Sequence, residues 1–379
     1  MWPGNRGTAA WHPRPMSYRN IQGMRAIAAL MVLSSHLFWS LVPMRSHWAK
    51  PYFSAVGPSG VDVFFVISGF IIYHVMQRSI GAMEVSGRGS AVFAFAMKRF
   101  IRIYPLYWVA FIAGCGVLAW APPTALPRQK SLFELLTLVD GIPNYVVNVA
   151  WSLAYEVYFY AVAAVSLLIL GRRAGWGPAA WFGLVAVAVG IGLGSPWREP
   201  FDYLFAPILL EFSFGVAVAM LVERGVRRLH GAMLPGAVAW MAAASYLLWE
   251  NPAFPSLRVL GWGVPAAVLI YAIVVLEVRR EWVMPRTLQY LGDASFSLYL
   301  WHMIVYDALA GIFVRLGWVG TVPATALAAF MAVIGVGVGL LSYHWLEKPL
   351  LRHLGQRFLG HGVASHSLGS EVRAGNLAG

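Results

Sequence analysis

The chain has 379 residues, of which 59% are hydrophobic and only 12% are charged, and its mean hydropathy is +0.65. This composition excludes an ordinary soluble domain, because such a domain needs charged residues over most of its surface. The formal net charge of +12 does not indicate nucleic-acid binding, since no basic face with interleaved aromatic residues stands outside the apolar runs. A single cysteine, Cys115, excludes a disulfide framework and a thiolate metal cluster, and we predict no metal site.

Apolar windows of about 20 residues recur along the chain, which is typical of a polytopic α-helical membrane protein. We therefore predict an all-α fold with about ten transmembrane helices. The first apolar segment is too long for a signal-peptide core and shows no small-residue cleavage site, so we expect it to be retained as a span. The predicted ranges are 24–44, 57–77, 103–121, 149–170, 178–195, 201–222, 232–249, 259–277, 292–313 and 321–345.

The Lys and Arg residues are divided unequally between the two sides of these spans. If the N-terminus is cytoplasmic, 21 of the 28 lie in the inside segments and 7 in the outside segments. This excess predicts that both termini are cytoplasmic. We divide the chain into a cytoplasmic N-terminal tail (1–23), a transmembrane domain (24–352) and a Gly/Ser-rich, disordered cytoplasmic tail (353–379).

Two smaller patterns concern local structure. The stretch "SLFELLTLVD", residues 131–140 of the Pro-rich outer loop, is compatible with a short interfacial helix. Glycines four residues apart, Gly190 with Gly194 and Gly335 with Gly339, predict close packing between helices.

The first predicted span carries two ionisable side chains, Arg25 and His36. They are eleven residues apart, so they share one helix face at a separation of about 16 Å. Ionisable residues in a membrane are costly and commonly mark function. A snorkelling anchor is the structural alternative for Arg25, and a helix–helix hydrogen bond is the alternative for His36.

Further ionisable residues inside predicted spans include Asp62, Glu156 and His302. The helical rise places Asp62 and Glu156 about 8 and 10 Å below the outer boundary. The same rise places His36 at about 12 Å and His302 at about 17 Å. We expect these four groups to meet in a proton-handling site, in which a carboxylate orients a histidine. A structural polar network is the alternative for the two carboxylates.

A basic cluster, Lys98, Arg99 and Arg102, occupies "MKRFIRIYPLYW" at the predicted cytoplasmic start of the third span. Paired guanidinium groups recognise phosphates, although an ordinary basic loop is the alternative. Arg25 lies on the same side of the membrane. An acyl-CoA bound there would hold its phosphates on these cations and extend its pantetheine arm toward His36.

Six blocks of the sequence resemble the signature blocks of the acyltransferase family 3 membrane proteins, in the right order and over roughly residues 18 to 352. In the spacing of these blocks and in its short length, the chain is most similar to the exopolysaccharide-production (ExoZ-type) O-acetyltransferase branch. The blocks are "YRNIQGMRAIAALMVLSSHL", "GVDVFFVISGFII", "KRFIRIYPLYW", "NVAWSLAYEVYFY", "GDASFSLYLWH" and "HWLEKPL". The resemblance implies a ten-span inner-membrane enzyme that moves acetyl or other short acyl groups from cytoplasmic acyl-CoA to sugar hydroxyls or antibiotics.

The resemblance also implies roles for individual residues. The family's arginine and histidine map onto Arg25 and His36, and its basic pair maps onto Arg99 and Arg102. Its acidic residue maps onto Glu156, and its late histidine block maps onto Tyr299 to His302. The final Glu-Lys-Pro turn, residues 347–349, is interpreted as a structural stop after the last span.

The resulting hypothesis is an O-acetyltransferase in which His36 is the general base and Asp62 or Glu156 orients it. Transfer through an acyl-histidine remains open. We expect no permanently bound cofactor, with acetyl-CoA as the donor substrate. The acceptor would be an exopolysaccharide, a lipopolysaccharide or a lipid-linked oligosaccharide. The enzyme would lie in the bacterial cytoplasmic membrane, with membrane lipids and polysaccharide-synthesis machinery as its partners. A macrolide-type acceptor, a secondary transporter and a scaffold are the alternatives.

Overall fold

The computed structural model describes residues 18–37, 50–120, 131–139, 146–190, 202–226, 230–248 and 257–359. Within these ranges the chain is helical and forms no β-strand, only an isolated bridge between Val319 and Val322. The predicted all-α class is therefore confirmed.

The longer helices correspond one by one to the predicted apolar ranges. They are α1 (Arg19–His36), α4 (Ser59–Ser86), α5 (Arg88–Trp120), α7 (Ala150–Leu170), α8 (Trp176–Gly190), α9 (Leu210–Glu223), α10 (His230–Leu248), α12 (Val264–Val278), α14 (Ser295–Arg315) and α15 (Ala324–Ser342). The shorter helical elements are α3 (Lys50–Val56), α6 (Leu132–Thr137), η1 (Gly171–Arg173), η2 (Asp202–Phe205), η3 (Pro207–Leu209), η4 (Val259–Gly263), α13 (Arg286–Asp293), η5 (Tyr343–Glu347) and α16 (Lys348–Leu359).

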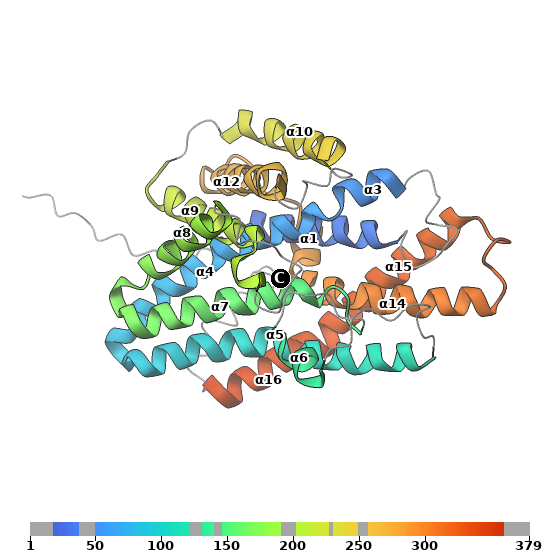
Figure 1. The fold of residues 1–379 in the computed structure, drawn as a ribbon, viewed down its shortest axis with the longest axis horizontal. Helices are drawn as coiled ribbons and strands as arrows, with labels where there is room; N and C mark the ends of the chain where they lie inside the picture. Colours follow the sequence, from blue (N-terminus) through green and yellow to red (C-terminus); the bar gives the residue numbers. More distant parts are fainter. Residues whose placement is uncertain are drawn as a thin grey trace, which may run out of the picture.

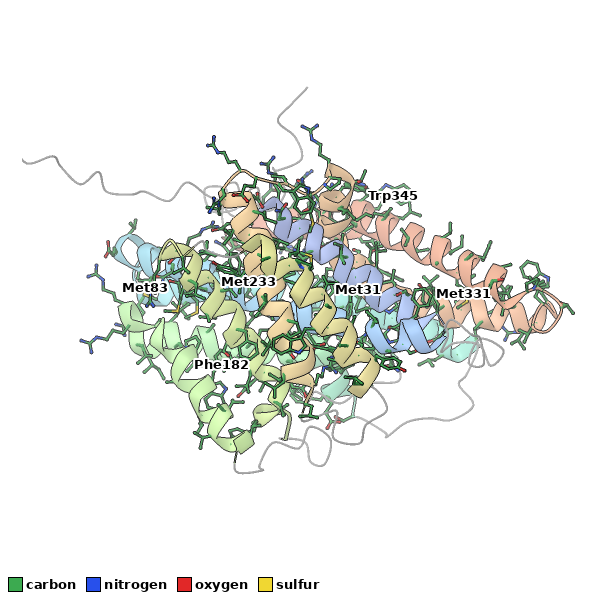
Figure 2. All side chains as sticks on the ribbon, turned by 90° about the horizontal axis from the view of Figure 1, so that it is seen from above. Met31, Met83, Phe182, Met233, Met331 and Trp345 are labelled. Atoms are coloured by element: carbon green, nitrogen blue, oxygen red, sulfur yellow. The ribbon has the colours of Figure 1, made fainter. Side chains whose placement is uncertain are left out.

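Most helices of the bundle run side by side. Figure 1 shows α10 at one edge, α5 and α16 at the opposite edge, and α1, α4 and α7 between them. The most extensive contacts join α4 to α9, α1 to α13, and α14 to α15. Figure 2 shows long, nitrogen-tipped side chains extending from the molecule near Met83 and near Trp345.

Six described helices are long and apolar enough to cross a membrane. Their ranges are 53–86, 88–120, 150–173, 259–278, 295–315 and 324–359. The other four predicted ranges hold the shorter helices α1, α8, α9 and α10. The chain is thus a multi-pass membrane protein.

Helix α5 starts at Arg88, well before the predicted start of the third span at residue 103. The prediction failed because a hydropathy window ends at a basic turn, whereas Lys and Arg are good helix formers and do not interrupt the hydrogen-bond ladder. Arg99 and Arg102 consequently lie inside a long helix and not at its beginning. Their side chains face neighbouring helices.

The predicted stop at residues 347–349 is wrong. Helix α15 continues through the π-helix η5 into α16, so that residues 324–359 form one helical run. Pro349 lies inside this run, two residues after the π-helical turn η5. The disordered tail predicted from residue 353 is likewise wrong up to Leu359; residues from 360 on lie outside the described ranges.

The local predictions had mixed outcomes. Helix α6 forms where the short interfacial helix was anticipated, and a capping box between Ser131 and Glu134 begins it. A Cβ at Gly335 or Gly339 of α15 would press on Tyr306 or Leu298 of α14, which confirms close packing there. A Cβ added at Gly190 would meet no atom of the described residues within 4 Å, and Gly194 lies outside the described ranges.

Stacked phenylalanines hold α4, α7 and α9 together at the centre of the bundle. The ring of Phe212 lies 4.7 Å from that of Phe65 and 4.4 Å from that of Phe159, measured between centroids. Gly69 and Gly215 allow the backbones of α4 and α9 to approach, because a Cβ on either would clash with the other helix. This packing fixes α4, which carries Asp62, and α7, which carries Glu156.

Candidate active site

His36 is the last residue of α1, so it stands at the end of the helix and not past its middle. The predicted continuation of this span through residues 38–44 lies outside the described ranges. The side chain is half-buried, and its Nδ1 lies 3.0 Å from the carbonyl oxygen of Val32, one turn earlier. That contact fixes which ring nitrogen faces back along α1.

His302 lies in α14 and is completely buried. Its Nδ1 lies 2.6 Å from the carbonyl oxygen of Tyr299, and its Nε2 lies 3.2 Å from Nδ1 of His36. The two imidazole centroids are 5.1 Å apart. The structure therefore brings together the two predicted histidines, which are 266 residues apart in the sequence.

Asp62 does not join the histidines. The fully buried carboxylate accepts hydrogen bonds of 2.9 Å from Nε and Nη2 of Arg258. The guanidinium carbon lies 5.2 Å from the ring centroid of Trp262 and 5.9 Å from that of Trp151. The expectation that Asp62 meets His36 is wrong, because a bidentate arginine satisfies this carboxylate better than a neutral imidazole does.

Glu211 of α9 is a second carboxylate at this ion pair, and the sequence analysis did not single it out. It is completely buried, within electrostatic range of both Asp62 and Arg258. Gly263 leaves room for it, since a Cβ there would lie 2.8 Å from Cγ of Glu211. An acidic residue inside the apolar range 201–222 was the available signal.

Glu156 of α7 also takes partners other than the histidines. Its Oε1 accepts a 3.2 Å hydrogen bond from Ser68 of α4 and a second, shorter one from Tyr160. The guanidinium carbon of Arg99 lies 5.6 Å from the centroid of the Tyr160 ring. Within the described residues, neither Asp62 nor Glu156 forms a hydrogen bond with either imidazole.

The two predicted phosphate-binding arginines face different neighbours. Arg99 is directed to α7, whereas Arg102 donates from Nη1 to Oε1 of Glu347 at 2.5 Å. Glu347 is 1% exposed, and its Oε2 accepts a 2.6 Å hydrogen bond from Ser297 of α14. The Glu-Lys-Pro pattern at residues 347–349 indicated a terminating turn and gave no sign of this ion pair.

Arg25 and Lys98 are both half-buried. Arg25 donates a 3.3 Å hydrogen bond to the side-chain oxygen of Gln22. Burial raises the pKa of Asp293, at the end of α13, and the nearby charges of Arg25, Arg102 and Lys348 oppose that rise. Arg25 and Arg102 therefore approach the same carboxylate from α1 and α5.

Two arginine–carboxylate pairs of the site, Arg102–Glu347 and Arg258–Asp62, involve a π-helix. Arg258 immediately precedes η4, and Glu347 is the last residue of η5. π-Helical turns are rare and occur frequently at functional sites. In the described part of the chain, no three His, Cys, Asp or Glu side chains are placed to hold a metal ion.

Comparisons with known proteins identify the family of the chain. Residues 18–343 match the acyltransferase family 3 model, described as an acyltransferase domain. The exopolysaccharide production protein ExoZ of Rhizobium meliloti is 31% identical over 82% of this chain and 95% of its own length. The acyltransferase MdmB of Streptomyces mycarofaciens is 28% identical over 91% of this chain and 94% of its own length.

A third relative is the peptidoglycan O-acetyltransferase OatA of Listeria monocytogenes, 23% identical over 88% of this chain and 56% of its own length. No solved structure matches the chain. The family model covers most of the sequence, including every histidine, carboxylate and arginine predicted for the site. The chain therefore belongs to acyltransferase family 3 and is a membrane enzyme that transfers acyl groups.

Proposed function

We propose that the chain transfers an acetyl or other short acyl group from cytoplasmic acyl-CoA to a sugar hydroxyl of an exopolysaccharide, lipopolysaccharide or related glycan. The observation that carries this proposal is the imidazole of His36, held at the end of α1 against a backbone carbonyl. The glycan acceptor is supported by the names of two relatives, an exopolysaccharide production protein and a peptidoglycan O-acetyltransferase.

The enzyme would lie in the bacterial cytoplasmic membrane with ten spans and both termini inside. Ten helical segments and the 21 to 7 division of the 28 basic residues support this topology. In this orientation α1 runs outward from the cytoplasm. His36 is then about 16 Å further along the helix than Arg25, at a rise of 1.5 Å per residue.

His36 would serve as the general base. A carbonyl oxygen can only accept a hydrogen bond, so the contact with Val32 favours the tautomer of the neutral ring that carries its hydrogen on Nδ1. The lone pair is then on Nε2. A base in this state can take the proton of an acceptor hydroxyl as that oxygen attacks the thioester.

The transfer balances without another reactant. The O–H bond of the sugar breaks as an N–H bond forms at Nε2 of His36, and the oxygen forms a C–O bond with the acyl carbon. The C–S bond then breaks, and the leaving thiolate takes the proton from Nε2, which restores the neutral base. In the alternative order Nε2 attacks the thioester first and expels the thiolate. The hydroxyl oxygen then takes the acyl group from the acyl-histidine as the C–N bond breaks, and the hydroxyl proton passes to the thiolate.

Arg25, Lys98, Arg99 and Arg102 would hold the phosphates of the acyl donor. Charge-assisted contacts between guanidinium groups and phosphates are strong, and Arg25 and Arg102 already approach one carboxylate, that of Asp293. Since Arg102 is paired with Glu347, Arg99 is the more informative residue for testing donor binding.

The test is mass spectrometry of acyl groups on the surface glycans of a deletion strain. The strain is complemented with wild type, His36→Ala, Arg99→Ala or His353→Ala at equal membrane expression. His353 is an exposed histidine of α16, so its variant controls for loss of an imidazole elsewhere.

Wild type and His353→Ala should restore one O-acyl group, and His36→Ala should lower the transfer rate by about 10²-fold or more. Full restoration by His36→Ala would disprove the role of the base. An unchanged glycan profile in the deletion strain would disprove the glycan acceptor and direct the search to small-molecule hydroxyls.

A further inference from the structure

The partner of His36 is a second imidazole and not a carboxylate. Nδ1 of His36 lies 3.2 Å from Nε2 of His302, which is completely buried in α14. Nδ1 of His36 thus has two neighbours, this nitrogen and the carbonyl oxygen of Val32 at 3.0 Å. Each ring also contacts a backbone carbonyl oxygen, that of Val32 for His36 and that of Tyr299 for His302. These contacts indicate which ring nitrogens carry hydrogens.

The carbonyl oxygen of Tyr299 fixes the state of His302. It lies 2.6 Å from Nδ1 of His302 and can only accept a hydrogen bond, so Nδ1 carries the hydrogen. In the neutral ring, Nε2 of His302 then presents its lone pair to His36. The opposite assignment would place nitrogen lone pairs against two carbonyl oxygens, those of Val32 and Tyr299, and would lose both hydrogen bonds.

Two tyrosine rings restrict the orientation of His302. The centroid of the Tyr299 ring lies 5.9 Å from that of His302, and the centroid of the Tyr306 ring lies 5.7 Å from it. The Tyr299 hydroxyl is itself fixed, 2.7 Å from the hydroxyl of Ser152. A ring confined in this way keeps the direction of its lone pair.

We propose that His302 is the positioning residue of the base: its Nε2 accepts a hydrogen bond from Nδ1 of His36 and holds that ring in the tautomer whose Nε2 is basic. This inference rests on the proposed role of His36 in acyl transfer. When Nε2 of His36 takes the hydroxyl proton, the resulting imidazolium keeps its Nδ1–H directed at His302, and no proton passes between the rings.

A neutral acceptor suits this location. A carboxylate in the same buried position would be a charge that needs its own partner, at considerable cost in the membrane. The carboxylates predicted for the task are engaged elsewhere, Asp62 with Arg258 and Glu156 with Ser68 and Tyr160. Positioning by histidine therefore replaces the carboxylate–histidine arrangement that the sequence suggested.

Two substitutions at position 302 separate positioning from packing. In His302→Gln the side-chain oxygen can occupy the place of Nε2, so the acceptor for His36 is kept. In His302→Asn the amide nitrogen can occupy the place of Nδ1 and keep the bond to Tyr299, but nothing reaches His36. Both variants remove the imidazole, so a purely structural role would affect them alike.

The experiment measures initial rates of transfer from radiolabelled acetyl-CoA to endogenous glycan in membranes of the deletion strain. His302→Asn should lower kcat by about 10²-fold or more at an unchanged KM for acetyl-CoA, whereas His302→Gln should stay within about tenfold of wild type. Equal losses in the two variants, or a wild-type kcat in His302→Asn, would overturn the positioning role.

A spectroscopic measurement keeps the test independent of activity. Nitrogen-15 magnetic resonance of histidine-labelled protein, with the His36 signal assigned from His36→Ala, should show Nδ1–H in wild type and His302→Gln and a mixture of tautomers in His302→Asn. An unchanged tautomer in His302→Asn would overturn the inference while leaving the acyl transfer intact. Full activity of His36→Ala would instead refute the proposed function itself.

Discussion

Arg102 of α5 and Glu347 of η5 form a 2.5 Å ion pair between residues that are 245 positions apart. The arginine side chain is 19% exposed, and the glutamate side chain is 1% exposed. A carboxylate this deeply buried depends on its counter-charge, because its charge is no longer solvated. The pair therefore fastens η5, inside the helical run 324–359, to α5.

Replacing Arg102 should consequently destabilise the fold. We expect Arg102→Met to lower the free energy of unfolding by about 3–5 kcal/mol, the usual effect of leaving one member of a buried ion pair unpaired. Arg352→Met, at an exposed position of α16, should change it by less than about 0.5 kcal/mol. Thermal unfolding in detergent measures both, and equal midpoints would show that Arg102 is not structural.

In the pair of Arg258 and Asp62, replacing the arginine should lower the stability of the protein more than replacing the carboxylate. Arg258→Met leaves two buried carboxylates, Asp62 and Glu211, next to each other without a cation. Asp62→Asn leaves Arg258 with Glu211 still in range as its counter-charge. We therefore expect Arg258→Met to cost about 3–5 kcal/mol of stability and Asp62→Asn clearly less.

Thermal unfolding of these two variants and of Arg258→Met in a Glu211→Gln background checks this explanation. The Glu211→Gln change should recover part of the loss, since it removes one of the two buried acidic groups that are left without a cation. If Asp62→Asn proves the more harmful single change, Glu211 does not share the guanidinium.

Much of the fold was predictable because hydropathy and helical rise are local properties. A helix occupies at least part of each of the ten predicted ranges, and the rise along α1 and α14 placed His36 and His302 at similar depths. The errors in the boundaries of α5 and α16 occur where charged residues lie inside a helix. Hydropathy windows end at such residues, although the backbone helix continues through them.

The partners of the carboxylates were not predictable by the same means. Depth along a helix fixes the level of Asp62, but its partner depends on which helix faces it. That partner is Arg258, 196 residues away, which lies between the predicted ranges 232–249 and 259–277. Long-range pairs of this kind depend on the packing of helices, and a single sequence does not record that packing.

The contact between α4 and α9 gives a third prediction. A Cβ at Gly69 would clash with the backbone of Phe212, whose carbonyl oxygen cannot move without shifting α9. We expect Gly69→Ala to cost about 1–3 kcal/mol of stability, the usual penalty of overpacking.

Gly81 is the matched control for this change, because it lies in the same helix and is exposed, and a Cβ added there would meet no atom of the described residues within 4 Å. Gly81→Ala should stabilise the protein by up to about 1 kcal/mol, since alanine is the better helix former. Parallel unfolding curves in detergent compare the two. A neutral Gly69→Ala would mean that α9 yields to the added methyl group.

The last prediction concerns Asp293, which is the last residue of α13 and lies outside the candidate spans. Burial raises its pKa above the ordinary value of 3.8, against the opposing influence of Arg25, Arg102 and Lys348. A carboxyl whose pKa is raised on folding binds its proton more tightly in the folded protein. Its contribution to stability is therefore full below pH 3.8 and is lost as the pH rises through the higher, folded-state pKa.

Asp293→Asn should remove this dependence, because the amide resembles the protonated acid and does not titrate. The variant should accordingly be more stable than wild type at neutral pH, and the difference should shrink as the pH is lowered toward 4. Unfolding midpoints of both proteins across this range measure the difference, in which the titration of all other carboxylates cancels. A wild type that is more stable than Asp293→Asn at neutral pH would show that the three nearby cations outweigh burial at this residue.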